Sequence, residues 1–239
     1  MLPPISGCVH LSVSGGCGGT TFGLQHARQV LISGDHVVWI CDEIPDGARF
    51  SQLYANVSPS AVSKLHLSAV GENTEIGIKS AIDLLNVLEN ISLVVIDDWT
   101  TKTGRPDSDL RNSMQALIKT CIEKEVAMVA ISSAYEDASG SGWKARGGLK
   151  ECEIWFLHRG QVESMYRELH TQGDKEERIS DFSLMEFLSL RLQQWLRSEL
   201  ESGKLSNKTS FDLWDICQRE DKVFHDSASG KAKAPKRHG

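Results

Sequence analysis

The sequence predicts an α/β protein: a mainly parallel, twisted sheet with helices on both faces and antiparallel strands at one edge. Two observations lead to this class. Short apolar runs alternate along the chain with longer segments whose apolar residues recur every three or four positions. Two further strand-like segments are joined by an Arg-Gly pair, as in a hairpin. Strands that alternate with helices pair in parallel, because each helix carries the chain back across a face of the sheet.

The expected strands are apolar runs bounded by glycine, asparagine or charged residues. They cover residues 8–13, 36–41, 64–70, 92–98, 126–132, 152–158 and 161–169. The expected helices have one apolar face each, and they cover residues 20–33, 48–57, 75–90, 109–125, 182–200 and 209–224. Residues 135–150 are rich in glycine, which predicts a loop between two strands.

Three segments differ in composition. Residues 1–182 hold the alternating pattern and form the expected core, residues 183–225 form a C-terminal helical extension, and residues 226–239 form a basic tail with a composition typical of disorder. Hydrophobic residues make up 40% and charged residues 24% of the chain, as is usual for a globular protein. A net charge of -6 argues against nucleic-acid binding over the whole surface.

The cysteines and the apolar runs indicate a cellular compartment. None of the six cysteines forms a C-x-x-C pair, so we expect free thiols in a reducing environment. No run approaches the roughly 18 apolar residues that cross a membrane. We therefore expect a cytoplasmic protein with no membrane partner. The eight histidines show no spacing typical of a metal site, and we assign them no chemistry.

A glycine-rich turn joins the first expected strand to the first expected helix. Backbone N–H groups in such a turn, together with the helix dipole, create an anion site. The candidate nucleotide-binding residues are Gly15, Gly16, Cys17, Gly18, Gly19, Thr20 and Thr21. A P-loop has lysine where Gly19 stands and glycine where Val13 stands. The alternative is a tightly packed turn that binds nothing.

Acidic residues follow two of the expected strands. Asp97 ends the strand 92–98, and Glu43 follows the strand 36–41. The carboxyl ends of parallel strands converge on the ligand crevice of an open α/β sheet. Thr20 and Asp97 are therefore candidate Mg²⁺ ligands, and Glu43 is expected in the same crevice.

The order of these parts resembles the RecA superfamily, in the branch that holds RadB, RadA-type recombinases and KaiC-like proteins. The resemblance covers residues 7–184. It rests on "GGCGGTTFGLQ" for the phosphate loop, "VVWICDEIPDGARFSQL" for the strand and acid that follow, and "SLVVIDDWT" for the Walker B strand. It implies a RecA-like fold, ATP or ADP with Mg²⁺ as the ligand, Glu43 as the general base and Asp97 as a metal ligand.

Three departures from that family bear on function: Gly19 replaces the lysine, Val13 the first glycine, and Ala134 a polar sensor. We therefore expect a pseudo-ATPase, or a very weak ATPase, that acts as an accessory subunit in DNA recombination or repair. Its expected partner is another RecA-type protein or a second copy. If the protein is a pseudo-ATPase, we expect no nucleotide cofactor.

Two other functions stay open. One is an active ATPase whose cation comes from a partner subunit or from a loop, the candidates being Lys102, Arg105, Lys144 and Arg146. The other is a KaiC-like regulatory scaffold that binds neither nucleotide nor DNA.

Single-stranded DNA is a candidate ligand of the loop 135–150. Trp143, Lys144, Arg146 and Lys150 combine an aromatic ring with positive charge, a pattern that suits base stacking and attraction to the phosphate backbone. The alternative is an ordinary solvated loop.

Overall fold

The fold is known from a computed structural model that describes residues 2–100, 106–136, 143–159, 166–171 and 175–180. The strands of this part are β1 (Cys8–Val13), β2 (His36–Cys41), β3 (Leu65–Ala69), β4 (Ile91–Asp97), β5 (Ala127–Glu136), β6 (Trp143–Ala145), β7 (Glu153–Arg159), β8 (Tyr166–Thr171) and β9 (Lys175–Ser180). Its helices are α1 (Gly19–Ser33), α2 (Gly47–Tyr54), α3 (Pro59–Val62), α4 (Thr74–Val87) and α5 (Ser108–Glu123).

The strands form one mixed sheet in the order β3-β2-β4-β5-β1-β7-β8-β9, and β6 pairs with β5 outside this path. Every pairing from β3 to β7 along this order is parallel. The pairings β7–β8 and β8–β9 are antiparallel. The predicted α/β class, with antiparallel strands at one edge, is therefore confirmed.

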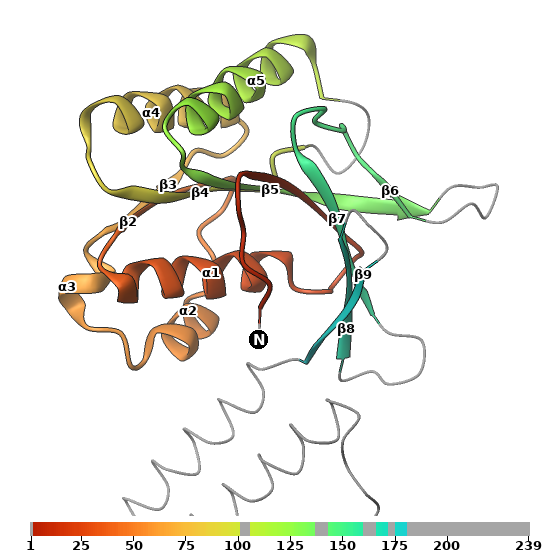
Figure 1. The fold of residues 1–239 in the computed structure, drawn as a ribbon, viewed down its shortest axis with the longest axis horizontal. Helices are drawn as coiled ribbons and strands as arrows, with labels where there is room; N and C mark the ends of the chain where they lie inside the picture. The colour runs from red at the N-terminus through yellow and green to blue at the C-terminus, as the bar shows by residue number, and fades with distance from the viewer. Residues whose placement is uncertain (1, 101–105, 137–142, 160–165, 172–174, 181–239) are drawn as a thin grey trace, which may run out of the picture. The chain divides into compact units, whose positions relative to one another are not determined.

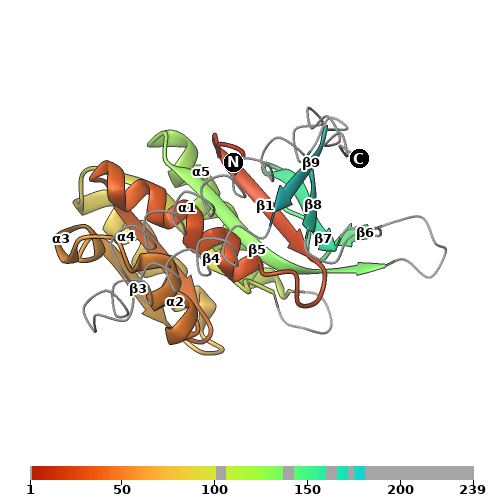
Figure 2. The same ribbon diagram turned by 90° about the horizontal axis from the view of Figure 1, so that it is seen from below.

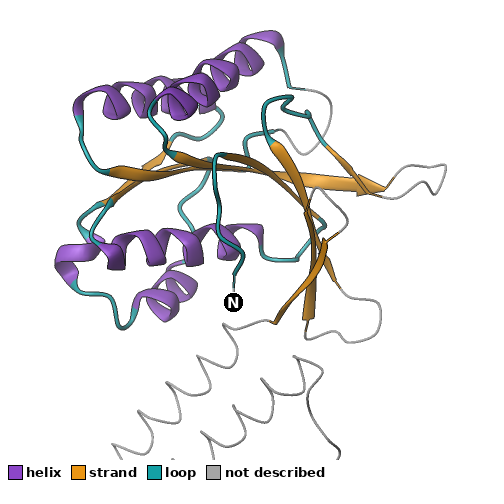
Figure 3. Cartoon of the chain, in the orientation of Figure 1, coloured by secondary structure: helices purple, strands orange, loops and turns teal. Residues whose placement is uncertain are grey.

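Helices cover both faces of the sheet. Figure 1 shows α1, α2 and α3 on one face and α4 and α5 on the other, and Figure 3 shows the same layers by element type. Seen from below in Figure 2, α1 runs across the central strands. This helix is the one that follows the glycine-rich turn, so the turn lies at the end of a central strand, β1.

The core lies on both sides of the central strands, because successive residues of a strand point to opposite faces. In β1, Val9 and Leu11 pack on the α1 side, whereas Cys8 packs with α4 and α5 on the other side. His10, which also faces away from α1 by this alternation, is fully buried. Such double burial explains why the central strands are mostly apolar instead of alternating between apolar and polar residues.

Some elements differ from the predicted ones. The expected loop 135–150 includes the end of β5 and the short strand β6, which pair with each other. The short helix α3 was not predicted; it begins with Ser58 as its N-cap and Pro59 at its first position. The helices expected in 182–200 and 209–224, and the extension 183–225 and tail 226–239, lie outside the described residues.

Two expectations about composition meet the structure here. The cysteines of the described residues are Cys8, Cys17, Cys41, Cys121 and Cys152, and all are free and buried. Among the helices of the described part, none combines the length and the apolar character needed to cross a membrane.

Candidate nucleotide site

The candidate site lies at the carboxyl ends of the parallel strands. Register places Cys41, the last residue of β2, directly beside Asp97, the last residue of β4. Val13, at the end of β1, pairs with Ser133 of β5. Because β1, β2 and β4 are parallel and end at this edge, the loops that follow them are brought together, as the sequence predicts.

The glycine-rich turn leads into α1 without a capping side chain. Gly18 is the N-cap with a φ of 83°, a left-handed conformation that favours glycine, and it offers no side-chain hydrogen bond. No acidic residue stands in the first turn of the helix. The first N–H groups of α1 are thus left for an acceptor from outside the helix, which suits an anion.

Cys17 turns inward instead of facing a ligand. Its backbone N–H donates to the Ser14 carbonyl over 3.1 Å, and its side chain is 4% exposed. Its Sγ lies 2.9 Å from the Ser14 hydroxyl. The Arg167 Nε donates to the Cys17 carbonyl over 3.3 Å, so strand β8 helps to hold the turn. Gly15, Gly16 and Gly18 are exposed around this inward-facing residue.

The place of the P-loop lysine is filled by its neighbours. A Cβ atom at Gly19 would lie 2.8 Å from Val13 Cγ2 and 2.9 Å from Ile131 Cγ2, closer than non-bonded carbon atoms approach. Val13 is the residue at the position of the first P-loop glycine. The two departures are therefore one packing arrangement: the Val13 methyl takes the space into which a side chain at position 19 would have to grow.

The predicted metal ligands are in contact. The Thr20 hydroxyl donates to Asp97 Oδ1 over 3.3 Å, which joins the first turn of α1 to the end of β4. Asp97 is 7% exposed, and burial raises its pKa from the ordinary 3.8 to about 6; the Thr20 hydrogen bond lowers the pKa and the neighbouring Asp98 charge raises it. Hydroxyl and carboxylate oxygens are suitable Mg²⁺ ligands, so the pair fits that ion.

A pocket of about 880 Å³ opens beside this pair. Thr20, Thr21 and Glu43 line it together with Asp97, whereas residues 15–19 are not among its lining residues. Most of its charge is negative. Its acidic residues are Asp42, Glu43, Asp46, Glu72, Glu75, Asp97, Asp98 and Asp107.

Arg49 is the one basic side chain among the described residues that line the pocket. Its Nε donates to the Thr21 hydroxyl over 3.2 Å, and its second guanidinium nitrogen donates to Gln52 over 2.8 Å. Helix α2 carries this residue and begins at Asp46, whose carboxylate accepts from the Arg49 N–H over 2.7 Å. A cation therefore reaches the start of α1 from helix α2.

Of the remaining predicted site residues, Glu43 lines the pocket, and the others do not line it or lie outside the described residues. Glu43 is exposed in the loop after β2 and lines the pocket. Lys144 is exposed on β6, and the Arg146 guanidinium lies 5.6 Å from the centre of the Tyr135 ring. Lys150 is exposed. Lys102 and Arg105, and the side chain of Trp143, lie outside the described residues.

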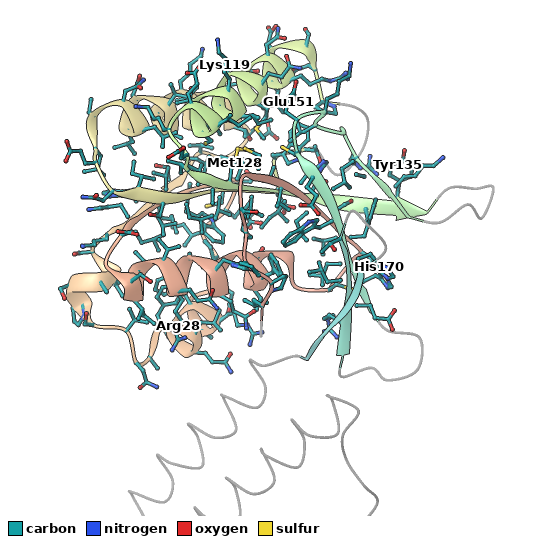
Figure 4. All side chains as sticks on the ribbon, in the orientation of Figure 1. Arg28, Lys119, Met128, Tyr135, Glu151 and His170 are labelled. Carbon is teal, nitrogen blue, oxygen red and sulfur yellow. The ribbon has the colours of Figure 1, made fainter. Side chains whose placement is uncertain are left out.

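Tyr135 is an aromatic residue that the sequence prediction missed. It lies on β5 opposite Lys144 of β6, and it is 42% exposed. Figure 4 shows it on the outer side of the β5–β6 hairpin. An exposed ring beside positive charge is the combination that the DNA-binding prediction assigned to Trp143. Tyr135 stands at the start of the expected loop, next to Glu136, and nothing in this part of the sequence indicated that it would be exposed beside positive charge.

Comparisons with known proteins bear on the fold. No protein-family model matches the chain, and no curated protein matches its sequence. Among solved structures, the crystal structure of the RadB recombinase is similar over 72% of this chain and 85% of that chain, with a TM-score of 0.57 and 18% sequence identity. At that identity the likeness concerns the fold. The chain has the RecA-like α/β fold that its sequence resembles.

Proposed function

We propose that this protein is a RecA-fold accessory subunit of DNA recombination or repair, with a nucleotide site that turns over ATP slowly or not at all. The observation that carries the proposal is the packing of Val13 and Ile131 against Gly19, which leaves no space for a lysine at that position. The fold shared with a recombinase supports the assignment to recombination or repair.

The missing lysine has a direct chemical consequence. In a P-loop the ammonium group neutralises the β- and γ-phosphate oxygens as charge develops on them. Removal of one preorganised charge of this kind costs about 3–4 kcal/mol in the transition state, or about 10²–10³ in rate. A water activated by Glu43 would attack a phosphorus atom whose charge is poorly compensated. Hydrolysis close to the background rate is the expected result.

Nucleotide binding can persist where hydrolysis does not. Thr20 and Asp97 would hold Mg²⁺, which would supply positive charge next to the phosphates, and the N–H groups at the start of α1 would donate hydrogen bonds to a phosphate oxygen. Eight carboxyl groups around the pocket repel an uncompensated triphosphate. Binding is therefore expected to require the metal ion.

The test measures hydrolysis and binding on the same full-length chain. Steady-state ATPase activity with Mg²⁺, with and without single-stranded DNA, should stay near background and should not change in Glu43→Gln. Calorimetric titration should give heat with Mg-ATP and none with ATP in EDTA. A turnover that matches that of lysine-containing relatives and is lost in Glu43→Gln would overturn the proposal.

The titration also separates the proposal from a nucleotide-free scaffold. Such a scaffold gives no heat with Mg-ATP or Mg-ADP and no stabilisation by either ligand. Binding to a RecA-type recombinase or to a second copy is the accessory role that we propose. Sedimentation of the chain alone and mixed with a RecA-type recombinase measures this binding. If the chain sediments as a monomer in both samples, the result would count against that role.

An active ATPase is the second candidate, because of the position of Arg49. Its hydrogen bond to Thr21 brings a guanidinium to the first turn of α1, where the phosphates would lie. Arginine is a strong phosphate ligand. Under this alternative, Arg49 replaces the lysine from another element, and its removal abolishes a measurable ATPase activity.

A further inference from the structure

Strands β7 and β8 carry three side chains with metal-ligand chemistry away from the pocket. His158 of β7 lies directly opposite Glu168 of β8, and His170 follows two residues along β8. Residues two apart on a strand point to the same face, so all three side chains share one face of this pair of strands. One ligand atom from each lies within 4.8 Å of the other two.

His158 and Glu168 are almost as close to each other as two ligands of one metal ion would be. His158 Nδ1 lies 3.7 Å from Glu168 Oε2, and the two side chains are 13% and 15% exposed. Ligands at Zn–N and Zn–O distances of about 2.0–2.2 Å in a tetrahedral site lie about 3.3–3.6 Å from each other. The His158 and His170 rings are stacked, with centroids 4.7 Å apart and an angle of 15° between them. The lone pair of an imidazole nitrogen lies in the plane of its ring, so the two rings must turn out of this stacked arrangement when both bind one ion.

We propose that His158, Glu168 and His170 form a binding site for a divalent transition-metal cation of the Zn²⁺ class. Two imidazoles and one carboxylate are a ligand set that suits borderline cations such as Zn²⁺, Co²⁺ and Ni²⁺. The carboxylate supplies the negative charge, and the three ligands come from two paired strands, which hold their spacing. Three protein ligands leave a further position for water or another donor.

The site is separate from the candidate nucleotide pocket. None of the three residues lines that pocket. Leu169, between two of the ligands on β8, points the other way and is fully buried in the core against α1. Arg167, on the same side as Leu169, donates to the Cys17 carbonyl of the glycine-rich turn. The proposal therefore does not depend on the nucleotide site. Figure 4 shows His170 beside β7 and β8.

The chain contains a matched control for the metal site. His36 of β2 and His66 of β3 also stack, with centroids 5.1 Å apart, and His36 Nδ1 lies 2.9 Å from His66 Nε2. Within the described ranges, no third histidine, cysteine or acidic residue is close enough to complete a ligand set around this pair. Loss of His66 should therefore leave a stoichiometric metal site intact.

The experiment titrates the untagged full-length chain with Zn²⁺ in competition with a chromophoric chelator. The wild type and His66→Ala should bind one equivalent with equal affinity. His158→Ala, His170→Ala and Glu168→Gln should each weaken binding about tenfold or more, since each removes one ligand of three. Co²⁺ should give d–d absorption bands in the wild type that the three variants lose. Circular dichroism melts establish that each variant is folded, and Glu168→Gln keeps the size of its side chain.

The pH dependence adds a second measurement. Protons compete with the metal ion for the nitrogen and oxygen ligands, so the affinity should fall as the pH is lowered. A wild type without a stoichiometric site overturns the proposal. So does Zn²⁺ that stays bound to all three ligand variants, because the metal is then held by other residues. An equal loss in His66→Ala overturns it too.

Discussion

The Thr20 hydroxyl donates to the Asp97 carboxylate across 3.3 Å, and this contact joins the start of α1 to the end of β4. It partly offsets the cost of burying a carboxylate that is 7% exposed. Burial still prevails, and it raises the pKa of Asp97 from 3.8 to about 6. The ionised form is therefore held in the folded protein at a cost, as is common for groups that bind a cation.

We expect Asp97→Asn to stabilise the protein at pH 8. A pKa raised in the folded state means that the stability from this group is complete below pH 3.8 and is lost as the pH rises through about 6. The difference between the two values corresponds to about 3 kcal/mol as an upper bound. Urea unfolding should show a gain for the variant at pH 8 and little difference at pH 4.

Magnesium provides the control for that variant. Added Mg²⁺ should raise the stability of the wild type at pH 8, because the ion favours the ionised carboxylate, and it should leave Asp97→Asn unchanged. Equal stabilisation of both proteins would mean that the ion binds elsewhere.

His10 and His26 should make the protein sensitive to acid. Burial lowers the pKa of each from 6.5 to about 4. Their contribution is complete above pH 6.5 and is lost as the pH falls through about 4, by about 3 kcal/mol for each. Between pH 4 and 6 the two histidines outweigh the opposite slope of Asp97. Urea unfolding at pH 7.5 and 4.5 should show a net loss at the lower pH.

His26→Leu tests the histidine contribution directly. Its ring packs against Phe22 at an interplanar angle of 54° with centroids 4.6 Å apart, and its Nε2 is buried without a hydrogen-bond partner. An apolar side chain of similar length should fit this place and remove about half of the acid sensitivity. A pH dependence that does not change in the variant would contradict the assignment.

Gly19→Ala should be destabilising, whereas Gly15→Ala should not. The new methyl at position 19 meets Val13 and Ile131 at under 3.0 Å, and such overpacking costs about 1–3 kcal/mol. At Gly15 a Cβ atom meets nothing within 4 Å. Adding Val13→Ala to Gly19→Ala should recover part of the loss, seen as a non-additive double-mutant cycle. Equal stability of Gly19→Ala and Gly15→Ala would contradict the tight packing of Val13 and Ile131 against Gly19.

Arg49→Met should weaken Mg-ATP binding about tenfold or more, because the pocket loses the cation that its described residues supply. Arg28→Met is the control: this arginine belongs to α1, is half-buried and does not line the pocket. Calorimetric titration of both variants with Mg-ATP measures their affinities. An unchanged affinity in Arg49→Met would place the phosphates away from the first turn of α1.

Tyr135→Ala should reduce affinity for single-stranded DNA, while Tyr135→Phe should keep it. The exposed ring is on β5 opposite Lys144 and has the Arg146 guanidinium 5.6 Å from its centre, and stacking of one base on such a ring contributes about 1–3 kcal/mol. Fluorescence anisotropy with a labelled oligonucleotide measures the affinity of each variant. Repeating it at two salt concentrations separates base stacking from attraction to the phosphate backbone. Affinity independent of salt would exclude backbone attraction as a source of binding.

The sequence predicted the strands and helices whose own residue pattern is sufficient to define them. The runs that became β1, β2 and β4 are mostly apolar because both faces of the sheet are covered, and α1 begins at the last glycine of the turn. The expected contact of Thr20 and Asp97 follows from the rule that parallel strands end at one edge. The three-residue strand β6 is too short to give a periodic signal.

Features that depend on register could not be read in advance. The packing of Val13 on Gly19 requires the rotation of α1 relative to β1. The cluster of His158, Glu168 and His170 requires the pairing of β7 with β8, because a shift of one residue would move the ligands to opposite faces. An E-x-H sequence on a strand, with a histidine on the preceding strand of a hairpin, is the pattern that would have indicated it.

The contact between Val13 and Gly19 also limits what evolution can do with this chain. A lysine introduced at position 19 alone is met by two methyl groups and destabilises the fold before it can benefit catalysis. A glycine introduced at position 13 alone opens a void and gains nothing. Because substitutions are acquired one at a time, a side chain at position 19 is expected only after a smaller residue at position 13 has made room for it.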